Sequence, residues 1–236
     1  MFFGFLDSHP LLACRNRQLG FKSMVNYAAQ LFASKELQLK EDDKIGMGNR
    51  RFVFQHPYHE ELCIKVARAS HIRAELDKRG FIYRNMPTHW RDDNWLEARA
   101  YQQKPLQSDN PKIWLHIPRL HGWQATNIGP GLVFDYYRSN DGSPAPNLRQ
   151  VLETEGLTST VECAIQRLNA FIHAQGIWMR HPGPPNIVLG ADGDLKLIDC
   201  LGTYNMPLMH LIPAMRKRRA KVHEAYLARA VANLTK

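Results

Sequence analysis

The sequence lacks the cysteine spacing of a metal or redox site, and it lacks long apolar runs. Its four cysteines are far apart and form no CxxC pair: Cys14, Cys63, Cys163 and Cys200. This spacing argues against a zinc ribbon and a thioredoxin-type motif. No stretch approaches the roughly 18 apolar residues that span a bilayer, and the apolar start at residues 1–6 has no basic segment before it. It is therefore a poor signal peptide, and we expect a cytoplasmic protein.

A uniformly basic surface is also missing, although the net charge is +9. Residues 1–35 carry +3 and residues 213–236 carry +6, whereas residues 36–212 are neutral. Since no nucleic-acid-binding motif accompanies this charge, nucleic acid is the least favoured partner. The basic run 216–221 is either a solvated helix face or a surface that attracts an anionic membrane or a phosphorylated glycan. The second interpretation would place the protein at the inner face of the membrane.

The first half of the chain has the pattern of an extension followed by a sheet. Residues 1–35 form the expected extension, with helical apolar spacing at 21–32. Residues 36–138 form a first lobe with one main helical segment within 70–104. Its strand-like runs are three within 38–66, one at 113–124 and one at 131–137.

The second half is mainly helical. A loop with two prolines at 140–147 separates it from the first lobe. Within residues 147–236 we expect two helices over 148–175, ending at Gly176. A hairpin over 186–198 and a basic C-terminal helix follow. The sequence therefore predicts an α+β fold with an antiparallel sheet in the first lobe and a small helical second lobe.

A glycine-rich turn lies between the first two strand-like runs. Residues 45–53 read IGMGNRRFV and match the pattern G-x-G-x-x-G-x-V, except that Arg51 stands at the third glycine. Gly46 and Gly48 would let backbone amides approach phosphate oxygens, and Val53 is the valine of the pattern. An ordinary hairpin turn has the same letters, so the motif gains weight only from its neighbours.

A lysine and a glutamate that could form the ion pair of a phosphate site follow, although the 32-residue separation between them is a long connection. Residues 63–66 read CIKV and resemble the V-A-I-K strand, whose lysine pairs the α- and β-phosphates. Glu97, on a segment with apolar neighbours, is expected to hold Lys65 in place. Glu75 is a rival partner. The alternatives are an ordinary edge-strand lysine and a solvated helix glutamate.

An amide and a carboxylate flank the predicted hairpin. Asn186 opens it and Asp199 ends it, 13 residues later. A tight hairpin brings both side chains to the same end of two paired strands. Hard oxygen ligands of this kind suit Mg²⁺ bridging nucleotide phosphates. The structural alternative is an asparagine turn and an aspartate cap.

In this order the motifs resemble the protein-kinase-like fold. Residues 134–142, FDYYRSNDG, with NLR at 147–149, look like the hinge of the YrbL-like proteins, a kinase-like bacterial family named for a PhoP regulatory network. The resemblance covers about residues 38–225. It implies a minimal bilobal kinase-like fold with ATP between the lobes. The hinge residues that would line the adenine pocket are Phe134, Asp135 and Tyr136.

The resemblance breaks near the expected catalytic loop. In H-R-D-L-x-x-x-N the catalytic Asp stands five residues before the Asn, and here that position is His181. A neutral imidazole accepts a hydroxyl proton near pH 7, so His181 is either a base or part of an inactive loop. Residues 199–202 are one residue longer than D-F-G, and only 37 residues follow Asp199. That length leaves no room for a protein-substrate platform.

We therefore expect a kinase-like protein that binds ATP and Mg²⁺ and transfers phosphate to a small-molecule acceptor, or to one linked to lipid or glycan. Lys65, Asp199 and His181 would be the catalytic residues. The alternative is an inactive pseudokinase that acts as a regulatory or binding module. A basic nucleic-acid-binding protein is the third interpretation.

Overall fold

The computed structural model describes the chain in six stretches: residues 35–48, 50–68, 92–108, 110–180, 182–201 and 212–235. The predicted N-terminal extension lies outside these stretches except for its last residue. Glu75 and His181 also lie outside them, so the predictions on these residues stay predictions.

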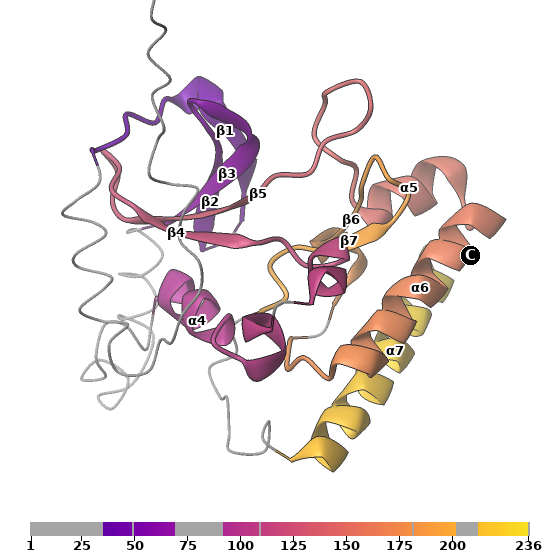
Figure 1. Ribbon diagram of the computed structural model, residues 1–236. Helices are drawn as coiled ribbons and strands as arrows, with labels where there is room; N and C mark the ends of the chain where they lie inside the picture. The colour runs from indigo at the N-terminus through magenta and orange to yellow at the C-terminus, as the bar shows by residue number, and fades with distance from the viewer. Residues whose placement is uncertain are drawn as a thin grey trace, which may run out of the picture.

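Five antiparallel strands form one sheet in the order β1-β2-β3-β5-β4 (Figure 1). The strands are β1 (Lys44–Met47), β2 (Arg51–His56), β3 (His59–Ala67), β4 (Leu120–Gln124) and β5 (Gly131–Asp135). All five predicted strand-like runs therefore contain a strand. The prediction for 113–124 was wrong in its first part, because η5 (Pro111–Leu115) is a 3₁₀ helix. Its Pro111 fits the first helical position, and the Asn110 side chain accepts from the Lys112 N–H.

The two faces of this sheet bury different side chains. The outer face packs a small core made only of apolar residues: Leu37, Leu39, Phe54, Ile64, Val66 and Val133. Because side chains alternate along a strand, the next residues in β2, β3 and β5 point to the inner face. These inner-face residues include Arg51, Val53, Cys63, Lys65, Leu132 and Phe134. The inner face packs toward α4 (Asp93–Ala100) and the main hydrophobic core.

Helix α4 lies against the sheet (Figure 1). It begins after Asp92, whose side chain accepts from the Asn94 N–H at 2.7 Å, an N-cap that satisfies a free helix donor. The helix buries Asn94, Leu96, Glu97 and Ala100. The first half also contains two short 3₁₀ helices, η2 (Glu41–Asp43) and η4 (Lys104–Gln107).

The second half consists of helices around a short hairpin, as the sequence predicted. Its elements are α5 (Leu148–Glu155), α6 (Ser159–Gln175), η6 (Pro184–Asn186), β6 (Ile187–Leu189), β7 (Leu195–Leu197) and α7 (Pro213–Leu234). Asn147 and Gln150 form a capping box at the start of α5. Gly176 ends α6 with a φ of 57°, a left-handed conformation that favours glycine. The fold is α+β, with an antiparallel sheet and a mainly helical second half.

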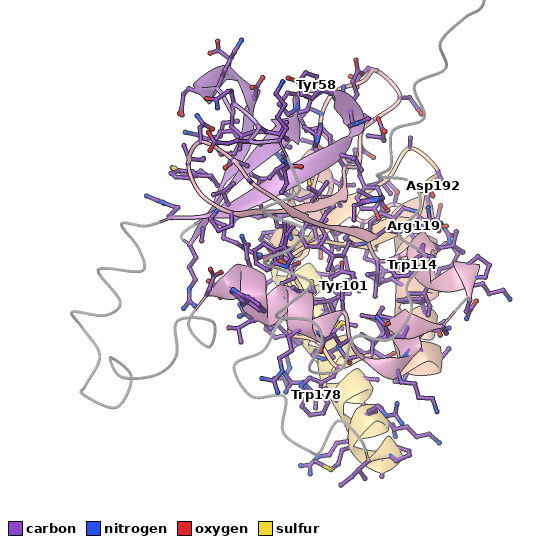
Figure 2. The ribbon with its side chains drawn as sticks, turned by 60° about the vertical axis from the view of Figure 1, so that its left-hand side comes forward. Tyr58, Tyr101, Trp114, Arg119, Trp178 and Asp192 are labelled. Atoms are coloured by element: carbon purple, nitrogen blue, oxygen red, sulfur yellow. The ribbon has the colours of Figure 1, made fainter. Side chains whose placement is uncertain are left out.

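The basic helix α7 packs beside α6 (Figure 1). A stripe of buried residues faces the core: Ala220, His223, Leu227 and Val231. Arg219 is also turned inward, since its guanidinium lies 5.3 Å from the ring centroid of Trp178, which Figure 2 shows beside this helix. Lys217, Arg218 and Lys221 are exposed. In the part of the chain that the structure describes, none of the helices has the length and apolar character needed to cross a membrane.

Candidate functional site

Four charged side chains meet between the inner face of the sheet and the end of the hairpin. We name them the charge cluster: Arg51, Lys65, Glu97 and Asp199. The Lys65 Nζ lies 2.9 Å from Glu97 Oε1 and 3.8 Å from Asp199 Oδ1. The Arg51 guanidinium forms direct ion pairs with Glu97 Oε2 and Asp199 Oδ1. Two cations and two anions thus alternate, and their formal charges cancel.

The strand register places both cations of the cluster. Val53 of β2 pairs with Lys65 of β3, and Arg51 lies two residues from Val53. Period-two alternation therefore turns Arg51 and Lys65 to the same face. Glu97 projects toward them from α4. The sequence analysis expected the contact between Lys65 and Glu97, and the structure contains it.

Asn94, three residues before Glu97, strengthens the attachment of α4 to the sheet. Residues three apart lie on the same side of a helix. The Asn94 Nδ2 donates to the Lys65 carbonyl at 2.9 Å, and its Oδ1 accepts from the Arg51 Nη1 at 3.3 Å. The side chains of Asn94 and Glu97 therefore fix the position of α4 against β2 and β3.

Three members of the charge cluster are almost completely buried. The exposed fractions are 2% for Glu97, 7% for Lys65 and 8% for Arg51. Burial alone would raise the pKa of Glu97, but the positive charges and hydrogen bonds of Arg51 and Lys65 outweigh it and leave this pKa below its usual value. Lys65 also lies 4.5 Å above the ring centroid of Phe134. Glu97 thus stays ionised between two cations.

Asp199 reaches the cluster from the second half of the chain. It follows β7 and has a φ of 56°, the one positive φ at a non-glycine residue in the described ranges. Backbone strain of this kind is typical of functional positions. Its side chain is 45% exposed. Asn186 lies at the same end of the hairpin, because its carbonyl accepts from the Ile198 N–H at 2.8 Å.

The predicted hinge residues lie next to the cluster, but their groups point in different directions. Phe134 is buried beneath Lys65. The Asp135 carboxylate turns toward β4, accepting from the Arg119 N–H at 2.8 Å and lying 2.7 Å from His121 Nε2. The Tyr136 N–H donates to a carbonyl of β3 at 2.8 Å. Tyr136 itself is partly buried and packs against the main hydrophobic core.

The glycine turn closes tightly between β1 and β2. The Gly48 N–H donates to the Arg51 carbonyl at 2.9 Å. A Cβ added at Gly46 would come no closer than 3.7 Å to another atom, and one at Gly48 no closer than 3.6 Å. These are ordinary contacts, so packing within the described residues does not require glycine at either position.

The residues at Asp199 do not fit a magnesium ion well. Mg²⁺ prefers several oxygen ligands, carboxylates among them. Asp199 supplies a carboxylate, but Oδ1 is already bound by Arg51. In the stretches that the structure describes, no group of three His, Cys, Asp or Glu side chains could hold a metal by itself, so a magnesium ion here would take most of its ligands from phosphates and water. The predicted ligands Asn186 and Asp199 lie at the same end of the hairpin, and the Arg51 guanidinium is paired with the Asp199 carboxylate.

Sequence reasoning missed the role of Arg51. It identified Arg51 only as a departure from the glycine pattern. The signal was present, because alternation from Val53 places Arg51 on the same face as Lys65. The contact with Asp199 could not be predicted from local spacing, since it joins residues 148 positions apart in the sequence.

Comparison with known proteins places this site within one family. A family model described as "PhoP regulatory network protein YrbL" matches residues 37–231, which include the whole charge cluster. The chain belongs to the YrbL family. The YrbL proteins of Escherichia coli (strain K12) and Shigella flexneri are each 30% identical to it over 117 residues. The aligned stretch covers 50% of this chain and 47% of each relative. The match therefore spans about half the length of the YrbL proteins it aligns with.

Proposed function

We propose that this member of the YrbL family has a minimal kinase-like bilobal fold and binds ATP between the five-stranded sheet and the β6–β7 hairpin. The observation that carries the proposal is the buried ion pair between Lys65 and Glu97, with Asp199 3.8 Å from the lysine Nζ. In kinase-like sites a lysine held by a helix glutamate grips the α- and β-phosphates. Lys65 has three N–H donors, and Glu97 engages one of them.

Stability alone does not explain this pair. A buried ion pair often contributes no more than a well-packed apolar pair of the same volume. Keeping two cations and a carboxylate under the sheet therefore suggests a ligand for them. The cluster is neutral as a whole, but Lys65 and Arg51 retain N–H donors that suit the oxygens of a nucleotide phosphate.

The glycines of the turn support the same proposal. On the outer face, a Cβ added at Gly131 would collide with the Ile64 side chain, so packing explains that glycine. Gly46 and Gly48 have no such crowding. Glycines free of a packing role in a turn beside two cations are suited to a backbone that approaches phosphates closely. The apolar side chains beside the cluster, with Val53 opposite Lys65 among them, would receive the base.

Phosphate transfer is the further part of the proposal. The acceptor would be a small molecule, or one linked to a lipid or glycan. The exposed cations of α7 (Lys217, Arg218 and Lys221) would attract such an acceptor, or an anionic membrane surface on the cytoplasmic side. His181 would be the base. A pseudokinase is the second candidate function, and the pairing of Asp199 with Arg51 favours it.

Thermal unfolding with and without ATP tests nucleotide binding. In magnesium buffer, ATP at about 100 times its Kd should stabilise the wild-type protein by about 2.7 kcal/mol. Lys65→Ala should remove this effect, whereas Lys112→Ala, which changes an exposed lysine on η5, should retain it. If millimolar ATP does not shift the unfolding transition of the wild-type protein, the proposal of nucleotide binding is wrong. Turnover by wild type and by His181→Ala then separates a kinase from a pseudokinase.

A further inference from the structure

Arg51 is held from three directions within the charge cluster. Its Nη1 contacts Glu97 Oε2 and lies 3.3 Å from Asn94 Oδ1, and its Nη2 contacts Asp199 Oδ1. Two of these acceptors belong to α4 and the third follows β7, so the guanidinium joins the two halves of the molecule. Its side chain is 9% exposed. Arg51 is therefore built into the site rather than swinging freely in solvent.

This arrangement gives Asp199 a cation from the protein itself. A divalent ion binding the same oxygen would have to displace the guanidinium. Displacement would leave Arg51 buried without one of its partners, which is costly for a buried ion pair. Arg51 thus neutralises the carboxylate through Oδ1, while the Asp199 side chain stays 45% exposed.

Arg51 also retains the means to bind phosphate. A guanidinium has five N–H donors in a fixed planar fork, and the three contacts given above use three of them. The remaining donors fit the oxygens of a phosphate, for which arginine is well suited. With Lys65 beside it, the site offers a polyphosphate two cations, whose charge Glu97 and Asp199 balance before any metal is added.

We propose that Arg51 neutralises the charge that a magnesium ion would otherwise neutralise, so that the site binds nucleotide phosphates without a divalent metal. The proposal rests on the nucleotide-binding function proposed above and defines its cofactor requirement. It also gives a reason for arginine at the third glycine position of the turn. A glycine there would leave Asp199 without this partner.

Calorimetric titration of ATP into the wild-type protein, once in EDTA and once in magnesium chloride, tests the proposal. We expect the Kd in EDTA to be within about threefold of the Kd in magnesium. A Kd that is weaker in EDTA by about tenfold or more overturns metal independence and leaves nucleotide binding intact. Absence of binding in both buffers overturns both proposals.

Substitutions at position 51 identify the residue responsible. Arg51→Gly restores the glycine of the pattern and should make binding depend on magnesium by about tenfold or more. Arg51→Lys keeps one charge but lacks the planar fork whose two Nη atoms reach Glu97 and Asp199 separately, so it should weaken binding in EDTA. Arg149→Gln is the matched control, because Arg149 is exposed and pairs with Glu153 of the same helix at 2.7 Å, outside the cluster. It should bind equally well in both buffers.

Circular dichroism of each variant first establishes that it is folded. If Arg51→Gly does not fold, the wild-type comparison and Arg51→Lys still decide the question. Binding that stays equal in EDTA and magnesium in a folded Arg51→Gly protein contradicts the role of Arg51.

Discussion

On the outer face of the sheet, Phe54, Ile64 and Val133 lie side by side across β2, β3 and β5 in a small apolar core. One residue away along the strands, the inner face carries Arg51 and Lys65 at similar depth. Burying hydrocarbon stabilises a fold directly, whereas burying charge does so only when every partner is present. The outer face therefore contributes to stability through its apolar contacts, whereas the inner face holds paired charges that the proposed nucleotide binding would use.

The largest expected effect comes from removing the Glu97 carboxylate, the buried anion of the inner face. Glu97→Ala leaves Arg51 and Lys65 without their shared partner, and losing one member of a buried pair costs about 3–5 kcal/mol. We expect the free energy of unfolding in urea to fall by this amount. ATP stabilisation should disappear at the same time. A loss of less than about 1 kcal/mol would contradict the importance of these ion pairs.

A cavity on the outer face should cost nearly as much but leave binding intact. Ile64 is completely buried, and Ile→Ala in a core costs about 2–5 kcal/mol through lost burial and the cavity. We expect Ile64→Ala to unfold at lower urea, with ATP stabilisation unchanged at a temperature where it is folded. If ATP no longer stabilises this folded variant, the two faces do not have separate roles.

The sequence predicted one contact of the inner face but not the difference between the two faces. The resemblance of CIKV to the V-A-I-K strand and the apolar neighbours of Glu97 were enough to pair Lys65 with Glu97. The full role of Arg51 was not predictable, because its partners come from α4 and from the end of β7. Which carboxylate a guanidinium meets depends on how distant elements pack, and local spacing does not contain that information. The 3₁₀ helix at 111–115 has a local cause that the apolar pattern does not contain, since Asn110 caps it and Pro111 stands at its first position.

Acidification should reduce the stability that the ionised Glu97 carboxylate gives to the folded protein. The pKa of Glu97 lies below its usual value of 4.5 because of the adjacent cations, even though burial opposes this shift. A lowered folded-state pKa stabilises the fold above the unfolded-state pKa, and this contribution is lost as the pH falls through the folded-state pKa. The stability difference between wild type and Glu97→Gln should therefore shrink below pH 4.5. Urea unfolding from pH 6 to the acid limit checks this, and a constant difference would contradict it.

Cysteine labelling gives the smallest effect and reports how closed the inner face is. Cys63 lies on that face, and burial raises its pKa to about 12, as it does for Cys200. Cys163 is exposed. In a Cys14→Ser background, iodoacetamide should modify Cys163 at least about tenfold faster than either buried thiol, because the thiolate is the reactive form. Peptide mass spectrometry measures the rates, and equal labelling of Cys63 and Cys163 would show that the inner face is open.

The most direct measurement uses a protein whose inner face has been made apolar. Arg51→Met, Lys65→Met and Glu97→Leu together remove the buried charges, and Asp199 keeps its contact with solvent through its exposed side. Replacing a buried ion network with apolar residues of similar volume is often neutral for stability. We expect this triple variant to be within about 1 kcal/mol of the wild type in urea unfolding. Calorimetric titration with ATP should then give binding by the wild type and none by the triple variant, whereas equal affinities would contradict a nucleotide site at the charge cluster.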